Sequence, residues 1–253
     1  MNNRGQVLII FLLLIPVLFL FAAVLVDSSI ILTNKSRLDN ISRDILNTVD
    51  YEKITEDEIS TLISINDSDI VLDDIYFEDK TITIKSHKLI KSVFGNIIGK
   101  DFYIVKSNIN KTYKTDLILR LDIKDGIVSN DKYTIKDNIL SINENINNRS
   151  ITFTFKNTGN GNLFNYDNLD IVIKDNNIYI DDELLSNIYE NNKLTITYSN
   201  NNINIYLNTT KIYDKNIYLK NSNIKINNKF NINKIRIYDR VLKIDELGGN
   251  YGE

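Results

Sequence analysis

VLIIFLLLIPVLFLFAAVLV, residues 7–26, is an unbroken run of twenty apolar residues near the N-terminus. At about 1.5 Å per helical residue the run is roughly 30 Å long, which matches the hydrocarbon core of a bilayer. Because a backbone in lipid must satisfy its hydrogen bonds internally, the run predicts a membrane-spanning helix with a bend at Pro16. A cleaved signal peptide is the alternative, but its apolar core is shorter, about 7–15 residues, and no clean small-residue cleavage site follows here.

The helical pattern continues beyond the apolar run. No glycine or proline interrupts residues 17–49, and polar residues fill the faces between recurring apolar positions. We therefore expect one helix from about residue 7 to 49, roughly 65 Å long. The apolar face of its outer half consists of Ile31, Leu38, Ile41, Ile45 and Val49. This face either packs on the protein's own next domain or serves as an assembly face for helices of neighbouring subunits.

The composition excludes several kinds of function. The 30 basic and 33 acidic residues are mixed along the 253-residue chain and give a net charge of −3, so no basic surface for nucleic acid is expected. The chain has no cysteine, which excludes disulfides, cysteine metal sites and thiol catalysis. His87, expected at the surface or in a turn, is the only histidine, and no paired-carboxylate motif occurs. We therefore predict no catalytic and no cofactor-binding residues, and a function that depends on contact, not turnover.

Residues 51–115 predict a small α/β region. Thr55 and Glu58 have the spacing of a capping box and predict a short helix over 55–63. The strands expected in this region are TITIKS (81–86) and FYIVKSNI (102–109).

An amphipathic stretch, KLIKSVFGNIIGK (88–100), lies between these two strands and contains two glycines. An apolar segment of this size between strands is usually part of a core, which is where we expect it. Contact with a membrane or a partner at the surface is the alternative.

From residue 116 onward the pattern is almost wholly β. Short runs rich in β-branched and aromatic residues alternate with turns that contain Asn, Asp or Gly, at a spacing of about 8–12 residues. The expected strands cover residues 117–123, 138–142, 150–155, 169–173, 177–180, 194–199, 203–207, 216–219, 223–226 and 234–239. This pattern predicts a two-sheet antiparallel β-sandwich or barrel, closed by one helical turn over 241–247. The fold class is therefore mainly β with a long N-terminal transmembrane helix.

Several tracts within residues 1–115 are similar to those of a known family. They are Arg4-Gly5-Gln6, the apolar run with Pro16, Val26-Asp27, Lys35-Ser36-Arg37-Leu38-Asp39-Asn40, and KLIKSVFGNIIGKDFYIVKS (88–107). The segment resembles the minor pilin-like proteins of the tight-adherence (Tad) pilus system, of the TadE/TadG type. The resemblance implies a pilin-like region and, as partners, pilus or secretion-assembly subunits. Ile10 departs from the pattern, because a processed prepilin of this class usually carries glutamate at the fifth position after Gly5.

Four tracts within residues 116–250 are similar to those of a second family. They are DLILRLDIKDG (116–126), SITFTFKNTGNGNLFN (150–165), ITYSNNNINIYLN (196–208) and KIRIYDRVLKIDEL (234–247). Their order resembles that of laminin G-like, concanavalin A-like domains, although Thr209 stands where glycine is usual. The resemblance implies a jelly-roll sandwich used for adhesion to carbohydrate or protein.

The second resemblance also implies calcium, because sandwich domains of this family often bind it with loop carboxylates and carbonyls. The acidic candidates are Asp122, Asp125, Asp239 and the cluster Asp181-Asp182-Glu183. No spacing among them defines a site, so the metal ligands stay unknown, and we expect the acidic cluster at a solvated turn. Five tyrosines either stack on sugars or lie half-buried in the sheets: Tyr179, Tyr198, Tyr206, Tyr213 and Tyr218.

These patterns predict three regions, namely an anchor and extended pilin-like helix (1–50), a small α/β pilin-like region (51–115) and a laminin G-like sandwich (116–250). We expect a single-pass membrane protein with its C-terminal domains extracellular. It would act as a pilin-like surface subunit that displays the sandwich for adhesion or for binding glycan or protein ligands. The alternative is a free-standing, membrane-anchored carbohydrate-binding module, and a glycan-active enzyme is a less favoured third hypothesis.

Overall fold

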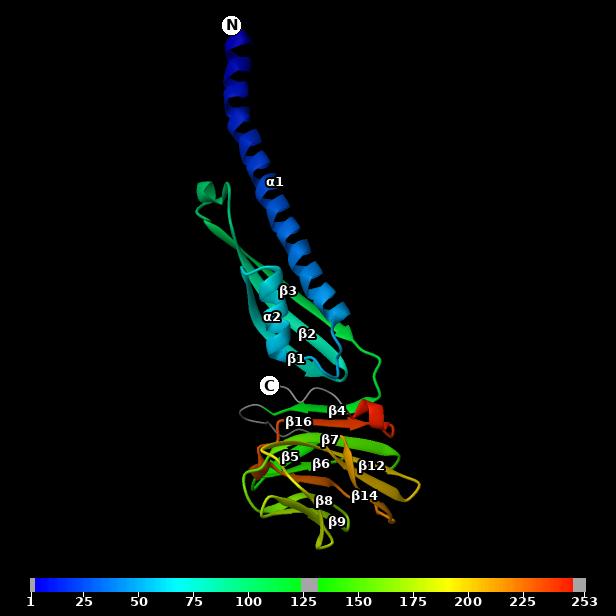
Figure 1. Ribbon diagram of the computed structural model, residues 1–253. Coiled ribbons are helices and arrows are strands. Elements are labelled where there is room, and N and C mark those ends of the chain that lie inside the picture. The colour runs from blue at the N-terminus through cyan, green and yellow to red at the C-terminus, as the bar shows by residue number, and fades with distance from the viewer. Residues whose placement is uncertain (1–2, 124–131, 248–253) are drawn as a thin grey trace. The chain divides into compact units, whose positions relative to one another are not determined.

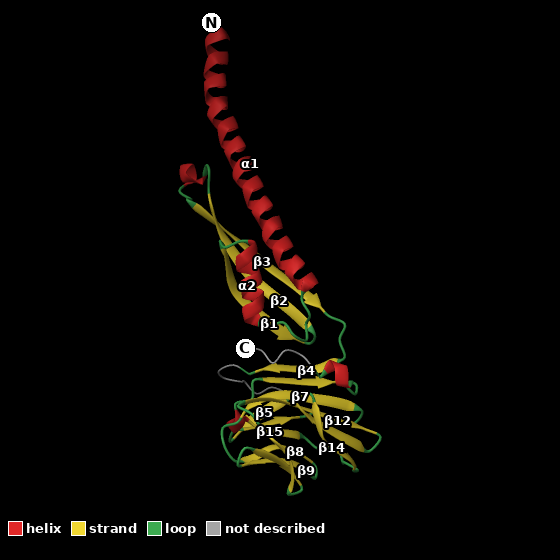
Figure 2. Cartoon of the chain, viewed as in Figure 1, coloured by secondary structure: helices red, strands yellow, loops and turns green. Residues whose placement is uncertain are grey.

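The computed structural model of the chain describes residues 3–123 and 132–247 (Figures 1 and 2). The chain divides into two compact units, Met1–Thr115 and Asp116–Glu253. The first unit combines a long helix with a small sheet, and the described part of the second consists of strands and short helical turns. The chain is thus mainly β with one long N-terminal helix, which confirms the predicted fold class.

Helix α1 (Asn3–Thr48) contains the apolar run and continues without a break along the sheet of the first unit. Pro16 lies inside it. Among residues 10–26 every side chain is exposed except that of Ala23. The helix is long and apolar enough to cross a bilayer. The prediction of one continuous helix is confirmed.

The sheet of the first unit has three antiparallel strands in sequence order. They are β1 (Ile70–Glu78), β2 (Thr81–Lys91) and β3 (Phe102–Thr112). Asp79 and Lys80 join β1 to β2 with positive φ angles of 44° and 64°, which is the geometry of a two-residue hairpin turn. Sequence analysis does not predict β1, because a bulge between Leu72 and Asp74 breaks its alternation of side chains.

Two helices pack in this unit. Helix α1 contacts β2 and β3, and α2 (Glu56–Asn66) contacts α1 and β1. The predicted capping box is confirmed, since the Thr55 hydroxyl accepts from the Glu58 N–H and the Glu58 carboxylate accepts from the Thr55 N–H. The buried side chains of α2 are Ile59 and Ile63, spaced one helical turn apart.

An ion pair joins the end of α2 to β2 and α1. The Lys88 ammonium lies 2.8 and 2.9 Å from the two carboxylate oxygens of Asp67, and the Arg37 guanidinium lies 3.4 Å from one of them. Burial raises the pKa of Asp67, but its hydrogen bonds and the positive charges of Lys88 and Arg37 outweigh that effect and hold the pKa below its usual value. The carboxylate therefore stays ionised as a link between three elements.

The apolar stretch over 88–100 is not the core segment that sequence analysis predicts. Strand β2 takes its first residues, and a short helical turn, η1 (Gly95–Ile98), follows. Ile90 is buried, but most of the described apolar side chains here are exposed, namely Leu89, Val93, Phe94 and Ile97. The hairpin between β2 and β3 extends beyond α2 and β1 (Figure 1).

The second unit is a sandwich of two antiparallel sheets, as predicted. The seven-stranded sheet has the order β11 (Glu183–Asn187), β10 (Asn177–Ile180), β9 (Leu169–Lys174), β8 (Gly161–Tyr166), β15 (Ile224–Asn227), β6 (Ile139–Ile142) and β5 (Tyr133–Lys136). The six-stranded sheet has the order β14 (Thr210–Asn216), β13 (Asn202–Leu207), β12 (Asn191–Ser199), β7 (Arg149–Lys156), β16 (Lys234–Tyr238) and β4 (Leu117–Asp122). Two short helical turns, η2 (Asn228–Phe230) and η3 (Ile244–Glu246), complete it.

Alternate side chains from both sheets form one core, in which Phe153 of β7 stacks on Phe164 of β8 with ring centroids 6.0 Å apart. Pairs of Asp and Asn residues make the tight turns around it, because these residues tolerate positive φ better than other non-glycine residues. The pairs with positive φ at both positions are Asp137-Asn138, Asp175-Asn176, Asp181-Asp182 and Asn200-Asn201.

The predicted strand over 216–219 is wrong. Beyond the end of β14 these residues form part of the loop before β15. The Ile217 N–H donates to the Asn201 carbonyl (2.7 Å), and the Leu219 N–H donates to the Tyr198 hydroxyl (3.1 Å). The backbone donors of the segment are therefore used to hold a loop, not to pair with a strand.

Sequence analysis also does not predict β5, β8, β11 and β14. These strands are short or contain Asn, Gly, Glu and Lys, which have low β propensity. Their pairing with neighbouring strands in the two sheets stabilises them despite that composition.

Candidate functional site

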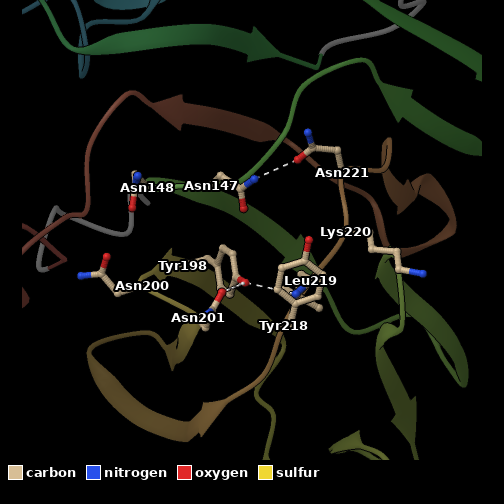
Figure 3. Close-up of a pocket in the computed structure, with 9 residues that line it drawn as sticks. All are labelled: Asn147, Asn148, Tyr198, Asn200, Asn201, Tyr218, Leu219, Lys220 and Asn221. Atoms are coloured by element: carbon tan, nitrogen blue, oxygen red, sulfur yellow. Dashed lines mark hydrogen bonds between the residues drawn. The ribbon is translucent and has the colours of Figure 1, made fainter.

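A pocket of about 400 Å³ lies where three loops of the sandwich meet (Figure 3). One loop joins β6 to β7, one is the turn between β12 and β13, and one joins β14 to β15. The residues that line the pocket are Asn147, Asn148, Tyr198, Asn200, Asn201, Tyr218, Leu219, Lys220 and Asn221.

Tyr198 holds two of these loops together. Its ring is buried, and its hydroxyl accepts a hydrogen bond from the Leu219 N–H. The same hydroxyl lies 3.2 Å from the Ile217 carbonyl and 3.2 Å from the Asn201 side-chain oxygen, each of which can accept its proton. A single residue of β12 thus fixes both the turn at Asn201 and the loop over 217–219.

Side-chain amides connect the third loop to the others. The Asn147 amide donates to the side-chain oxygen of Asn221 at 2.8 Å, as Figure 3 shows. The Ser199 hydroxyl donates to the side-chain oxygen of Asn148 at 3.2 Å. The rim of the pocket is therefore held in place before any ligand arrives, which lowers the entropic cost of binding.

The pocket combines an apolar floor with a polar rim. Tyr198 and Leu219 are buried beneath it, whereas the asparagines, Lys220 and Tyr218 are exposed. Each asparagine amide carries both donors and acceptors, and an exposed aromatic ring offers a flat apolar face. None of the nine lining residues carries a carboxylate or an imidazole. This arrangement suits a ligand that bears many hydroxyl groups and has an apolar face.

Of the five tyrosines considered as stacking residues, Tyr198 and Tyr218 line the pocket. Tyr198, Tyr206 and Tyr213 are buried, and Tyr179 is half-buried, so their rings pack within the sandwich and are not exposed for stacking on a ligand. Tyr218 has 68% of its surface exposed and lines the pocket. Sequence analysis assigns Tyr218 to a strand, and its position in a loop is what makes the ring available.

The candidate calcium ligands are dispersed. Within residues 3–123 and 132–247 no three histidine, aspartate or glutamate side chains lie close enough to hold a metal ion. Asp181 and Asp182 form the turn between β10 and β11 and pair with Lys215 and Lys174, each at 3.4 Å. Asp239 pairs with Arg149 at 3.1 Å, and Asp125 lies outside the described residues.

Asp122 is held by two arginines on adjacent strands. The Arg236 guanidinium donates to one carboxylate oxygen at 2.6 Å, and the Arg120 guanidinium donates to the other at 2.8 Å. Burial raises the pKa of the Asp122 carboxyl, but the charges and hydrogen bonds of Arg236 and Arg120 outweigh it and hold the pKa below the usual 3.8. Asp122 therefore joins β4 to β16 as an anion.

This link predicts a pH-dependent stability of the sandwich. A carboxyl group whose pKa is lowered by folding stabilises the fold above its unfolded pKa, and that contribution is lost as the pH falls through the folded value. We expect Asp122→Asn to lower the free energy of unfolding by roughly 2 kcal/mol at pH 7, with a difference from the unmodified protein that shrinks below about pH 4. Denaturant unfolding between pH 7 and 2.5 measures this difference. Asp182→Asn, with a side chain 93% exposed, is the control and should show little effect at any pH; a constant deficit for Asp122→Asn would contradict the ion-pair explanation.

The predicted assembly face of α1 divides in two. Leu38 and Ile45 are buried, with 1% and 4% of their surfaces exposed, whereas Ile31, Ile41 and Val49 are half-buried. Because α1 contacts β2 and β3 of its own unit, Leu38 and Ile45 are core residues. At these two positions the structure shows packing on the protein's own domain, the first of the two alternatives.

Two polar residues of the first unit have defined partners. His87 lies in β2, not in a turn, and its Nδ1 is 2.6 Å from an Asp73 carboxylate oxygen. Asp27, the first charged residue after the apolar run, is buried and accepts hydrogen bonds from Ser92 and from the backbone at Val93 and Phe94. Sequence analysis assigns no contact to Asp27, because its partners are about 65 residues away along the chain.

No protein-family model and no curated protein sequence matches the chain. Among solved structures it is similar to Trypanosoma rangeli sialidase, with 10% identity, a TM-score of 0.38, and coverage of 69% of this chain and 43% of the sialidase. It is similar to domain 4 of a GH43 extracellular arabinanase from Geobacillus stearothermophilus in complex with arabinotriose (13% identity, TM-score 0.33, 51% of this chain and 85% of that domain). It is also similar to the binding domain of botulinum neurotoxin DC in complex with SialylT (12% identity, TM-score 0.34, 71% of this chain and 44% of that chain). The chain spans less than half of the sialidase and toxin chains, and at TM-scores below 0.5 these similarities carry no argument about function.

Proposed function

We propose that this protein is a membrane-anchored surface protein whose sandwich unit binds a glycan in the pocket between its three loops. The observation that carries the proposal is the set of five asparagines around the exposed ring of Tyr218. A sugar has hydroxyl groups around its ring and an apolar face formed by its C–H groups. Amide side chains match the hydroxyls, and an aromatic ring matches the face.

Binding, not turnover, is the activity that this pocket supports. Bond cleavage in a glycan ordinarily needs two carboxyl groups that flank the scissile bond. The residues lining the pocket supply amides, two phenols and one ammonium group instead. These groups hold and orient a ligand, and Lys220 favours glycans that carry a negative charge.

The long helix supplies the anchor in this proposal. Helix α1 crosses the membrane once through its apolar run and carries the first unit on its outer part, with the sandwich outside the cell. The role that fits the resemblance of residues 1–115 is that of a pilin-like subunit that works with pilus or secretion-assembly proteins. In that role the protein displays an adhesive domain, and the same pocket serves the alternative of a free-standing glycan-binding module.

We expect Tyr218→Ala to weaken glycan binding about tenfold, or about 1.4 kcal/mol, because the stacking surface is lost. The purified full-length protein in nanodiscs is first applied to an array of neutral and sialylated oligosaccharides, and the affinity for the best-bound glycan is then measured for each variant. Tyr189→Ala is the matched control, since Tyr189 is also a surface tyrosine of the sandwich, 72% exposed, and does not line the pocket.

The same glycan, fluorescently labelled, tests the orientation. Glycans do not cross membranes, so intact cells that carry the full-length chain should bind it and cells with Tyr218→Ala should bind it weakly. Equal affinity for the Tyr218→Ala and Tyr189→Ala variants would show that the pocket is not the binding site. Binding that appears only after cell lysis would show that the sandwich is not outside.

A further inference from the structure

Exposed apolar side chains gather at the end of the β2–β3 hairpin, where the strands turn through η1 (Figure 1). They are Leu89, Val93, Phe94, Ile97, Phe102 and Ile104, and we call this set the apolar tip. Ile97 is 65% exposed, and Phe102 and Ile104 are 59% and 61% exposed. Such a cluster on a small unit marks a contact surface, because isolated apolar residues are common on protein surfaces but continuous patches are not.

Asp27 attaches this hairpin to α1. The Ser92 hydroxyl donates to the Asp27 carboxylate at 2.7 Å, and the N–H groups of Val93 and Phe94 donate to it at 3.0 and 3.3 Å. The Tyr103 hydroxyl adds a longer contact of 3.4 Å. A buried carboxylate with this many donors holds the hairpin at one defined height along the helix.

Two glycines allow the hairpin to adopt this shape. A side chain on Gly95 would collide with the Ser92 hydroxyl and with the Lys100 carbonyl, and the Gly95 N–H itself donates to that hydroxyl. Gly99 has a φ of +75°, in the left-handed region that favours glycine. Gly95 and Gly99 therefore determine the turn that exposes Val93, Phe94 and Ile97.

The height of the attachment coincides with the end of the apolar run. Asp27 directly follows residues 7–26, so the proposed membrane surface lies close to it. Ala23 lies one helical turn nearer the N-terminus than Asp27, and it is the one buried residue among residues 10–26. Helix α1 also contacts η1, the turn at the end of the hairpin. One helical turn is about 5.4 Å, which places the end of the hairpin level with the outermost turn of the span.

We propose that the apolar tip inserts into the outer leaflet of the membrane beside α1 and gives the protein a second contact with lipid. This inference rests on the proposed membrane anchor. The last residues of the span, Val24, Leu25 and Val26, are exposed as well, and they lie on the same helix that contacts η1. Apolar groups of interfacial segments reach about 5–10 Å into a bilayer, a depth that the end of the hairpin can attain from this position.

The charges around the apolar tip fit a lipid surface. Lys91, Lys100 and Asp101 are exposed at the two ends of the segment that connects β2 to β3, so the positive charges there outnumber the negative one. Ammonium groups in such positions meet the phosphates of lipid headgroups while the apolar side chains enter the hydrocarbon boundary. The ligand is therefore a bilayer that contains anionic lipid.

The absence of cysteine from the chain makes a direct test simple, because one introduced cysteine can be labelled uniquely. Three full-length variants are prepared: Ile97→Cys at the tip, Leu18→Cys inside the span, and Ile65→Cys on α2, where the side chain is 74% exposed. Each is labelled with an environment-sensitive fluorophore and reconstituted into vesicles of phosphatidylcholine and phosphatidylglycerol. Emission wavelength and quenching by lipids with a nitroxide near the headgroup or deep in the acyl chain are then measured.

The expected result is a blue shift and loss of fluorescence with the shallow quencher for Ile97→Cys, deep quenching for Leu18→Cys, and neither for Ile65→Cys. Deep quenching at Leu18→Cys without lipid quenching at Ile97→Cys would overturn the tip contact and leave the anchor intact. No quenching at either position would overturn the anchor and the tip contact together. A blue shift at Ile97→Cys that lipids do not quench, and that disappears when the protein is diluted in the bilayer, would assign the tip to contact with other copies of the chain and overturn the lipid proposal.

Discussion

Leu38→Asp should unfold the unit formed by residues 3–115 while the sandwich stays folded. Leu38 is 1% exposed on the side of α1 that packs on the unit's own sheet. An aspartate there would place a charge in an apolar core with no designed partner, which costs several kcal/mol, a large fraction of the stability of a small unit. Hydrogen exchange of the full-length protein in nanodiscs checks this unit by unit, with loss of protection expected in β2 and β3 and not in β7 or β12.

Leu32→Asp is the matched control for this prediction. Leu32 lies on the same helix, also outside the apolar run, but 68% of its surface is exposed. This variant should keep the exchange protection of the first unit. Normal protection in Leu38→Asp would show that the inner face of α1 does not stabilise the unit, and would restore the interpretation of Leu38 as an assembly residue. A defect in assembly that appears with Leu32→Asp alone would place the assembly face on the exposed side of the helix.

Phe153→Ala should destabilise the sandwich by about 3–5 kcal/mol, which is the usual cost of removing a large aromatic side chain from a core. Phe153 is 1% exposed and stacks on Phe164 from the opposite sheet with an angle of 11° between the rings. Its loss removes contacts between the sheets and leaves a cavity that neighbouring strands cannot fill without moving. For a domain of this size we expect a fall in melting temperature of roughly 10–15 °C, measured by circular dichroism in the β-sheet band.

Tyr189→Ala provides the control for this measurement too. The side chain of Tyr189 is 72% exposed, so its removal should change the free energy of unfolding by less than about 0.5 kcal/mol. If Phe153→Ala unfolds at nearly the same temperature as this control, the two sheets do not share the tightly packed core described above.

Local patterns predict much of the architecture because their physical causes are local. The apolar run, the uninterrupted helical spacing after it and the capping box at Thr55 depend on residues within a few positions of one another. Alternation of side chains likewise predicts most strands of the sandwich. It fails at β1 of the first unit, where a bulge shifts the alternation, at 216–219, where backbone donors are taken by Asn201 and Tyr198, and at the short or polar strands β5, β8, β11 and β14.

The pocket could not be predicted in the same way. Its residues come from three loops and from strand β12, and the Asn147–Asn221 hydrogen bond spans 74 positions. Asparagine is abundant along the whole chain, so no local signal separates the asparagines of the pocket from those of ordinary turns. The element that packs on the apolar face of α1 could not be predicted for a similar reason. Periodicity shows which side chains of a helix are apolar, but it does not show which element covers them.

The attachment of the hairpin to Asp27 has a consequence for how the first unit is oriented. A helix whose apolar stretch is longer than the hydrocarbon thickness of its bilayer can accommodate the difference by tilting. Because α1 runs unbroken from the span to Thr48, is bound to the end of the β2–β3 hairpin at Asp27 and packs on the sheet around Leu38, the first unit turns as one body with the helix. In the proposed membrane-anchored state, a thinner bilayer would therefore tilt this whole unit together with the helix, without altering a contact within it.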